Sequence, residues 1–242
     1  MPNDDTFSLK LQRLVGQIKF RPTLDSFNGV PNIAKELEND YDEWRAPKNS
    51  DVTLYTPSQK KFIQLNSDFI TYVNEGSLIV NESEATIIEL KEHFEKLYAK
   101  FVADCSIEII NRVGFRNTII IETDFEYQDL VNLIYGKFYS TNELIKNISS
   151  EEQKDVAFIL DSMKNDFLNH IQIGPVTKEQ ALMHFNSKFD VDIDHIAKNG
   201  VFIDLDVFVK DGLTGDNVLS KFNGAIDENF RIINAYIDYL SS

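Results

Sequence analysis

The feature of this sequence that most constrains its fold is an order of elements that occurs twice. A strand, a helix, three short strands and a long amphipathic helix are predicted up to Asp104, and the same order follows it. Copies of one unit usually bury their apolar faces against each other. The order therefore predicts a single α+β body with one half in residues 1–103 and the other in residues 104–242, a duplicated β-α-β-β-β-α unit.

The first half is divided by its prolines and turn residues. Residues 9–22 contain a strand that stops at Pro22, because proline cannot donate to a ladder. Pro31 suits the first turn of a helix. Apolar residues then recur at helical spacing at Ile33, Leu37, Tyr41 and Trp44. The other predicted elements are strands at 51–57, 60–66 and 68–74 and a long helix at 83–104 with Ser83 as its N-cap.

The second half repeats this order with a short helical insertion. Short turns between consecutive strands favour a largely antiparallel sheet, and we expect the long helices to pack on one of its faces. The predicted elements are a strand at 105–122, a helix at 123–147 capped near Asp124, a hairpin at 155–162 and 165–176, the inserted helix at 177–189, a strand at 200–212 and a final helix at 216–240.

Composition limits the classes of function. The chain has 39 acidic and 24 basic residues and a formal charge of −15, which disfavours binding to nucleic acids and to anionic membranes. Attraction to a basic protein surface stays open. No signal peptide or membrane span is expected, so we predict a cytoplasmic protein. Cys105, the single cysteine, reads as a small buried residue and not as a nucleophile.

Two arginines interrupt the apolar strand at 105–122. Arg112, Gly114 and Arg116 alternate with other residues and so share one face of the strand. They could form an anion clamp, with the glycine admitting a phosphate or carboxylate to the backbone. Alternatively, Asp204 and Asp206 on the strand at 200–212 could meet them as cross-strand salt bridges. The second interpretation predicts salt-bridge distance between at least one arginine and one of these aspartates.

Catalytic and metal-binding patterns are missing from the sequence. Asp190, Asp192, Asp194 and His195 lie close together, but the run lacks the glycine and glutamate that a calcium loop needs. We interpret them as solvated loop residues. The four histidines lack zinc-site spacing, and no serine-hydrolase, P-loop or dinucleotide motif is present. We therefore expect no cofactor and no catalytic residues.

Three stretches carry a family resemblance. Residues 64–97, the element "NRVGFRN" at 111–117 and the strand "FIDLDVFV" at 202–209 resemble a sporadically distributed family of uncharacterised bacterial proteins. That family has an Arg-x-Gly-x-Arg strand and a C-terminal Asp-x-Asp strand before a final amphipathic helix. Its element is usually followed by an aromatic residue and an asparagine, whereas Asn117 and Thr118 follow here. Its scattered distribution implies carriage in mobile gene cassettes such as those of phage defence.

Three functions are compatible with these observations. The first is a non-enzymatic acidic interaction protein that docks a protein partner, and it is preferred because catalytic patterns are lacking. The second is a small-ligand sensor or metal-dependent enzyme that uses Arg112, Arg116, Asp204 and Asp206. The third is an acidic nucleic-acid mimic that inhibits a basic effector.

Overall fold

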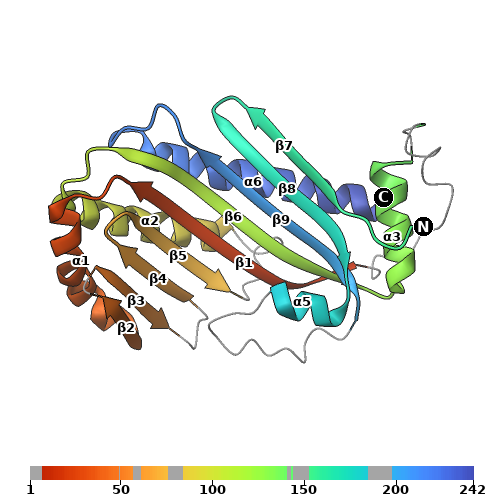
Figure 1. The fold of residues 1–242 in the computed structure, drawn as a ribbon, viewed down its shortest axis with the longest axis horizontal. Coiled ribbons are helices and arrows are strands. Elements are labelled where there is room, and N and C mark those ends of the chain that lie inside the picture. Colours follow the sequence, from red (N-terminus) through yellow and green to blue (C-terminus); the bar gives the residue numbers. More distant parts are fainter. Residues whose placement is uncertain are drawn as a thin grey trace.

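The protein is an α+β structure built on a nine-stranded antiparallel sheet (Figure 1). The computed structural model describes residues 7–48, 50–56, 61–75, 84–140, 143, 153–184 and 198–242. Its strands are β1 (Phe7–Phe20), β2 (Glu43–Lys48), β3 (Asp51–Thr56), β4 (Lys61–Asn66), β5 (Phe69–Glu75), β6 (Ile110–Thr123), β7 (Phe158–Lys164), β8 (Phe167–Val176) and β9 (Gly200–Val209). Its helices are α1 (Leu24–Leu37), the 3-10 turn η1 (Glu38–Asp40), α2 (Glu84–Cys105), α3 (Tyr127–Phe138), α5 (Lys178–His184) and α6 (Val218–Ser241).

Two long strands form the centre of the sheet. The strand order is β2-β3-β4-β5-β1-β6-β9-β8-β7, so the first five strands of the chain lie on one side of the β1–β6 junction and the last four on the other. The strands β1 and β6 are antiparallel and pair from Phe7 opposite Thr123 to Phe20 opposite Ile110. Each is bordered on its other side by the last strand of its own sequence segment, β5 or β9.

The first helix begins earlier than the sequence suggested. Thr23 caps α1 by accepting from the Ser26 backbone N–H, while the Ser26 hydroxyl oxygen accepts from the Thr23 N–H. This capping box starts the helix at Leu24, so the predicted start at Pro31 is wrong. Pro31 lies inside the helix instead.

The end of that helix was also predicted wrongly. It stops at Leu37, and Trp44, predicted to lie on its apolar stripe, belongs to the edge strand β2. The first segment therefore contains four strands after its helix, where three were expected. The alternation of charged Glu43 and Arg45 with apolar Trp44 and Ala46 has the strand period of two, and it was overridden by the helical spacing from Ile33.

The main hydrophobic core lies between one face of the sheet and the helices α2 and α6, which run behind the strands in Figure 1. Alternate residues of β9 and the apolar stripes of both helices fill this core: Val201, Ile203, Leu205, Val207, Val209, Leu90, Phe94, Leu97, Phe101, Phe222, Ile226 and Ile233. The proposed cap Ser83 lies outside the described residues. The opposite face carries Arg112 and Arg116 and is called the open face below because neither α2 nor α6 covers it, although Tyr55, Phe62 and Val73 on it are buried. The short helix α5 packs at one end of the open face, where Ala181 joins a small cluster with Leu11, Ile120 and Phe202.

The two long helices meet over a glycine. The rings of Phe94 in α2 and Phe222 in α6 are stacked, with centroids 4.0 Å apart. Gly16 of β1 lies beneath them, and a Cβ atom there would approach Phe222 Cζ to 2.8 Å and Phe94 Cε2 to 3.2 Å. The glycine thus makes room for the stacked pair at the centre of the core.

Each long helix also contacts the first helix of its own segment. Gly29 of α1 lies so close to the end of α2 that a Cβ atom would come within 2.7 Å of Cys105 Sγ. On the other side of the molecule, Phe138 of α3 contacts Tyr236 of α6, with centroids 6.1 Å apart. Cys105 is fully buried, as predicted, and burial raises the pKa of its thiol to about 11. A thiol in that state is a poor nucleophile.

Within the described residues, none of the helices is both long and apolar enough to span a membrane.

The packing at Gly16 makes a quantitative prediction. Gly16→Ala should lower the free energy of unfolding by about 1–3 kcal/mol, because the new methyl group overpacks a fully buried stacked pair. The control is Gly136→Ala in α3, where a Cβ atom would meet nothing within 4 Å. That change should stabilise the protein by about 0.5–1 kcal/mol, the usual gain from replacing a helical glycine. Urea denaturation measures both, and equal effects would show that Gly16 is not constrained by Phe94 and Phe222.

Candidate functional site

The five residues that the sequence singled out lie on two neighbouring strands. Arg112, Gly114 and Arg116 come from β6, and Asp204 and Asp206 come from β9. Arg116 is directly opposite Asp206 in the antiparallel register. Since alternate residues of a strand share a face, all five lie on the open face. The structure therefore brings the complete predicted set together.

Both arginines are paired with the aspartates. Arg116 donates from Nε to Asp204 Oδ1 at 2.8 Å and from Nη2 to Asp204 Oδ2 at 2.5 Å. Arg112 donates from Nη2 to both carboxylate oxygens of Asp206 at 2.7 Å. The prediction that at least one arginine lies within salt-bridge distance of these aspartates is confirmed.

The absence of a side chain at Gly114 leaves space for the Arg112 side chain to reach Asp206. The guanidinium of Arg112 extends along the strand past Gly114 to reach Asp206, and a Cβ atom on Gly114 would lie 3.2 Å from Arg112 Cζ and 2.6 Å from Phe208 Cβ. The same guanidinium stacks on the Phe208 ring, 4.7 Å from its centroid. The space next to the backbone is thus filled by protein groups and not left open for a ligand.

The ion pairs belong to a polar network that crosses the middle of the sheet. Arg112 Nη1 donates to Gln17 Oε1 at 3.2 Å, and Gln17 Nε2 donates to Thr71 Oγ1 at 3.0 Å. The chain of contacts thus runs from β5 through β1 and β6 to Asp206 in β9. A further pair, Arg13 with Glu75, joins β1 to β5 with an Nε–Oε1 distance of 2.8 Å.

In this network each arginine neutralises the charge of one aspartate. Asp204 is almost completely buried and also accepts from Thr118 Oγ1 at 2.8 Å, while half of the Arg116 side chain is exposed. Hydrogen bonding to Asp204 raises the pKa of Arg116 above its usual value. A phosphate or carboxylate ligand would have to displace these carboxylates, leaving Asp204 buried without its cation, which is costly.

Two hollows flank the hairpin formed by β7 and β8. On the open face, a hollow of about 430 Å³ is lined by Asp161, Met163, Leu168, His170 and Phe208, together with Ser162 and Asn169. On the helix-covered face, a groove of about 270 Å³ lies between the hairpin and α6, with Leu160, Ser162, Lys164, Glu228, Arg231 and Tyr236 among its lining residues. His170 Nδ1 lies 2.6 Å from Asp161 Oδ1 in the first hollow.

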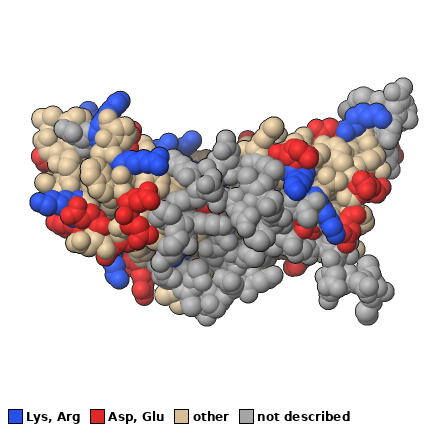
Figure 2. All heavy atoms as spheres, turned by 90° about the horizontal axis from the view of Figure 1, so that it is seen from below, with Lys and Arg blue, Asp and Glu red and all other residues tan. Residues whose placement is uncertain are grey.

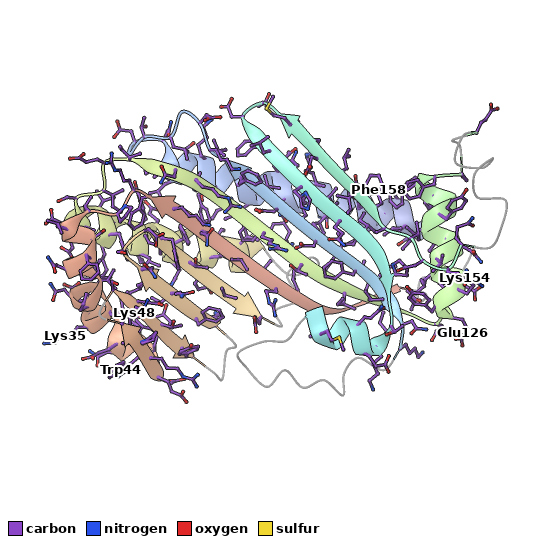
Figure 3. All side chains as sticks on the ribbon, in the orientation of Figure 1. Lys35, Trp44, Lys48, Glu126, Lys154 and Phe158 are labelled. Carbon is purple, nitrogen blue, oxygen red and sulfur yellow. The ribbon has the colours of Figure 1, made fainter. Side chains whose placement is uncertain are left out.

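A third hollow involves a residue that sequence reasoning misplaced. Trp44 is 65% exposed and borders a groove of about 360 Å³ between α1 and the strands β2 and β3. Pro31 and Ala34 line it from α1, and Leu54 lines it from β3. Figure 3 shows Trp44 at the same end of the molecule as Lys35 and Lys48. The strand-like alternation around Trp44 is the signal that could have placed this residue in a strand.

Metal-binding groups are not gathered at any of these places. In the described ranges, no three histidine, cysteine, aspartate or glutamate side chains are placed to hold a metal ion. The acidic run that contains Asp190, Asp192, Asp194 and His195 lies outside those ranges.

Comparisons with known proteins add little to this geometry. No family model and no curated protein matches the sequence. Among solved structures, one similarity is to a chain described as Methanococcus jannaschii TBP, with 8% identity over 93% of this chain and 98% of that chain. Its TM-score of 0.26 is too low to define a shared fold or function.

The paired arginines predict an effect on stability. Arg116→Ala should cost about 2 kcal/mol of unfolding free energy, less than the full penalty for a buried pair because water reaches half of this arginine. Lys100→Ala is the control, since Lys100 pairs with Glu36 at 2.5 Å on the exposed surface of α1 and α2. The control should change stability by less than about 0.5 kcal/mol. Equal small effects from both variants would indicate that Arg116 is not structural, and would favour a binding role for it.

Proposed function

We propose that this protein is a non-enzymatic interaction protein that docks a protein partner. The observation that carries the proposal is that Arg112 and Arg116 are each held by both oxygens of an aspartate. The most site-like residues of the sequence are thereby committed to holding the sheet together. A partner would therefore bind elsewhere on the surface, where apolar side chains are exposed at both ends of the sheet.

The net charge of −15 favours a basic partner. Long-range attraction to an oppositely charged protein speeds association and disfavours partners of the same sign. Figure 2 shows acidic and basic side chains next to each other at both ends of the described surface on that side. In the described part of this one face, the mixture supports protein docking over mimicry of nucleic acid, because a mimic needs an unbroken run of negative charge.

We also propose that the scaffold arose by duplication of one unit, with the halves at residues 1–103 and 104–242 and with the long helices α2 and α6 on one face. Three features support this. β1 and β6 are antiparallel neighbours at the centre of the sheet, each pairs with the last strand of its own half, and each half packs its first helix on its long helix. Under this proposal, the edge strand β2 was added later to the first half and the helix α5 was added later to the second half.

The alternative of a small-ligand sensor or metal-dependent enzyme is less well supported. It would use the four charged residues of the network, and those are already paired with one another. A true ligand raises the melting temperature by mass action. We therefore expect no concentration-dependent shift from nucleotides, inorganic phosphate or divalent cations.

Affinity purification of the full chain tests the docking proposal. A tagged protein, incubated with extract of its native cells at low ionic strength, should retain a partner with a basic isoelectric point, and added salt should release it as charges are screened. An unrelated protein of matched net charge is the control and should not retain that partner. Failure to retain any specific partner, together with a saturable melting-temperature shift from one of the small ligands, would replace docking with ligand sensing.

A further inference from the structure

The two edges of the sheet differ in their protection against a further strand. At one edge, β2 carries Pro47, which cannot donate a hydrogen bond, and it also carries Arg45 and Lys48. Proline and charge are the usual devices that stop an edge from pairing with another chain. At the other edge, β7 also carries two charged residues, Asp161 and Lys164, but it has no proline and exposes apolar side chains: Ile159 by 57%, Leu160 by 42% and Met163 by 71%.

The β7 edge is held firmly in strand geometry by its hairpin. Every residue of β7 is paired with β8, from Phe158 opposite Ile173 to Lys164 opposite Phe167. The connection is a two-residue turn in which Asn165 has a φ of 54°, the left-handed conformation that tight hairpins require. The Phe158 ring anchors the other end by stacking on Phe138 of α3, with centroids 4.3 Å apart.

The register of the β7–β8 hairpin determines which backbone groups of β7 are not bonded to β8. With a two-residue turn, Lys164 and Phe167 exchange backbone hydrogen bonds, and this pairing recurs at every second residue. The N–H and C=O groups of Ile159, Asp161 and Met163 consequently point away from β8. In the described sheet no strand lies beyond β7, so these groups face outward. They form a template for one more antiparallel strand.

On each face of the sheet a hollow begins at β7 and extends inward over β8 to β9. The hollow of about 430 Å³ borders β7 on the open face at Asp161 and Met163, and the groove of about 270 Å³ borders it on the helix-covered face at Leu160 and Lys164. Alternate side chains of a strand point to opposite faces of a sheet. A bound strand can therefore form main-chain hydrogen bonds with β7, and long side chains on each of its faces can lean over β7 towards the hollow on that face.

We propose that β7 docks an extended, basic segment of a partner protein as a tenth strand of the sheet. This rests on the proposed function and specifies where and how the partner binds.

The charge pattern selects a basic segment and not a second copy of the chain. Asp161 lies at the middle of β7 and its side chain is 81% exposed, so a lysine or arginine opposite it on an added strand would form a cross-strand ion pair. The nearest lysine of the strand is engaged within the protein, since Lys164 Nζ lies 3.4 Å from Glu228 Oε2. His170 Nδ1 lies 2.6 Å from Asp161 Oδ1 and leaves most of the Asp161 side chain exposed. Two copies of the chain would each bring a net charge of −15, and symmetrical pairing centred on Asp161 would place the two Asp161 carboxylates opposite each other.

A synthetic strand tests the proposal directly. The probe is a labelled peptide of about eight residues with alternating valine and lysine, and the control peptide carries glutamate in place of lysine. Titrated with the full chain, the lysine peptide should bind at least about tenfold more tightly than the glutamate peptide, and weakening with salt should confirm the charge contribution. Hydrogen exchange on the complex should show new protection at residues 158–164.

Variants at the two edges identify the site. Met163→Pro removes an outward N–H without breaking the ladder to β8, and should weaken binding of the lysine peptide by about tenfold or more. Met163→Lys keeps the backbone intact and provides a second test by placing like charge at the edge. Asp161→Asn should weaken binding severalfold. Trp44→Ala, at the opposite edge, is the matched control and should leave binding unchanged.

Several outcomes would overturn the proposal. Protection at residues 43–48, or loss of binding in Trp44→Ala alone, would move docking to the other edge and leave the proposed function standing. A dimer in sedimentation that Met163→Pro abolishes would make a second copy the occupant. Equal binding of both peptides would remove the basic specificity. If the partner retained in affinity purification binds Met163→Pro and Met163→Lys as well as the original chain, β7 is not the site although the protein does dock a partner.

Discussion

The pairing of β1 with β6 is the interaction on which the rest of this structure depends. These are the longest strands in the described sheet, with 14 residues each, and they pair along almost their whole length although about a hundred residues separate them in the chain. Every other strand is added outward from this pair. One face of the pair presents Leu14, Ile18, Val113 and Phe115 to the helices, so the same junction also supplies the middle of the hydrophobic core.

The opposite face of the junction explains why charged residues interrupt an apolar strand. Arg112 connects Gln17 of β1 with Asp206 of β9, and Arg116 compensates the buried charge of Asp204. Side-chain bonds of this kind fix the alignment of neighbouring strands, because a shift by one residue would move every side chain to the other face. Charges at the centre of the sheet are thus paired with one another, which is why the proposed docking falls to an edge of the sheet.

Much of this was predictable from local patterns, and the failures have physical causes. Strand periodicity correctly placed the arginines on one face of their strand, and Asp204 and Asp206 on one face of theirs. The short turns correctly indicated antiparallel hairpins. Pro31 resembles a helix start signal, but the capping box formed by Thr23 and Ser26 starts α1 at Leu24. Trp44 continued a helical spacing by coincidence. The groove of the helix-covered face could not be predicted, since it depends on how far α6 and the β7–β8 hairpin are separated in space.

The central claim is that the arginine–aspartate pairs belong to the scaffold, and a double-mutant cycle on Arg112 and Asp206 tests it most directly. Arg112→Gln, Asp206→Asn and the double variant would be compared by urea denaturation of the full chain. A structural pair predicts a favourable coupling energy of about 1–3 kcal/mol between the two sites. Additive effects, with a coupling near zero, would contradict the claim and return these residues to the role of a ligand site.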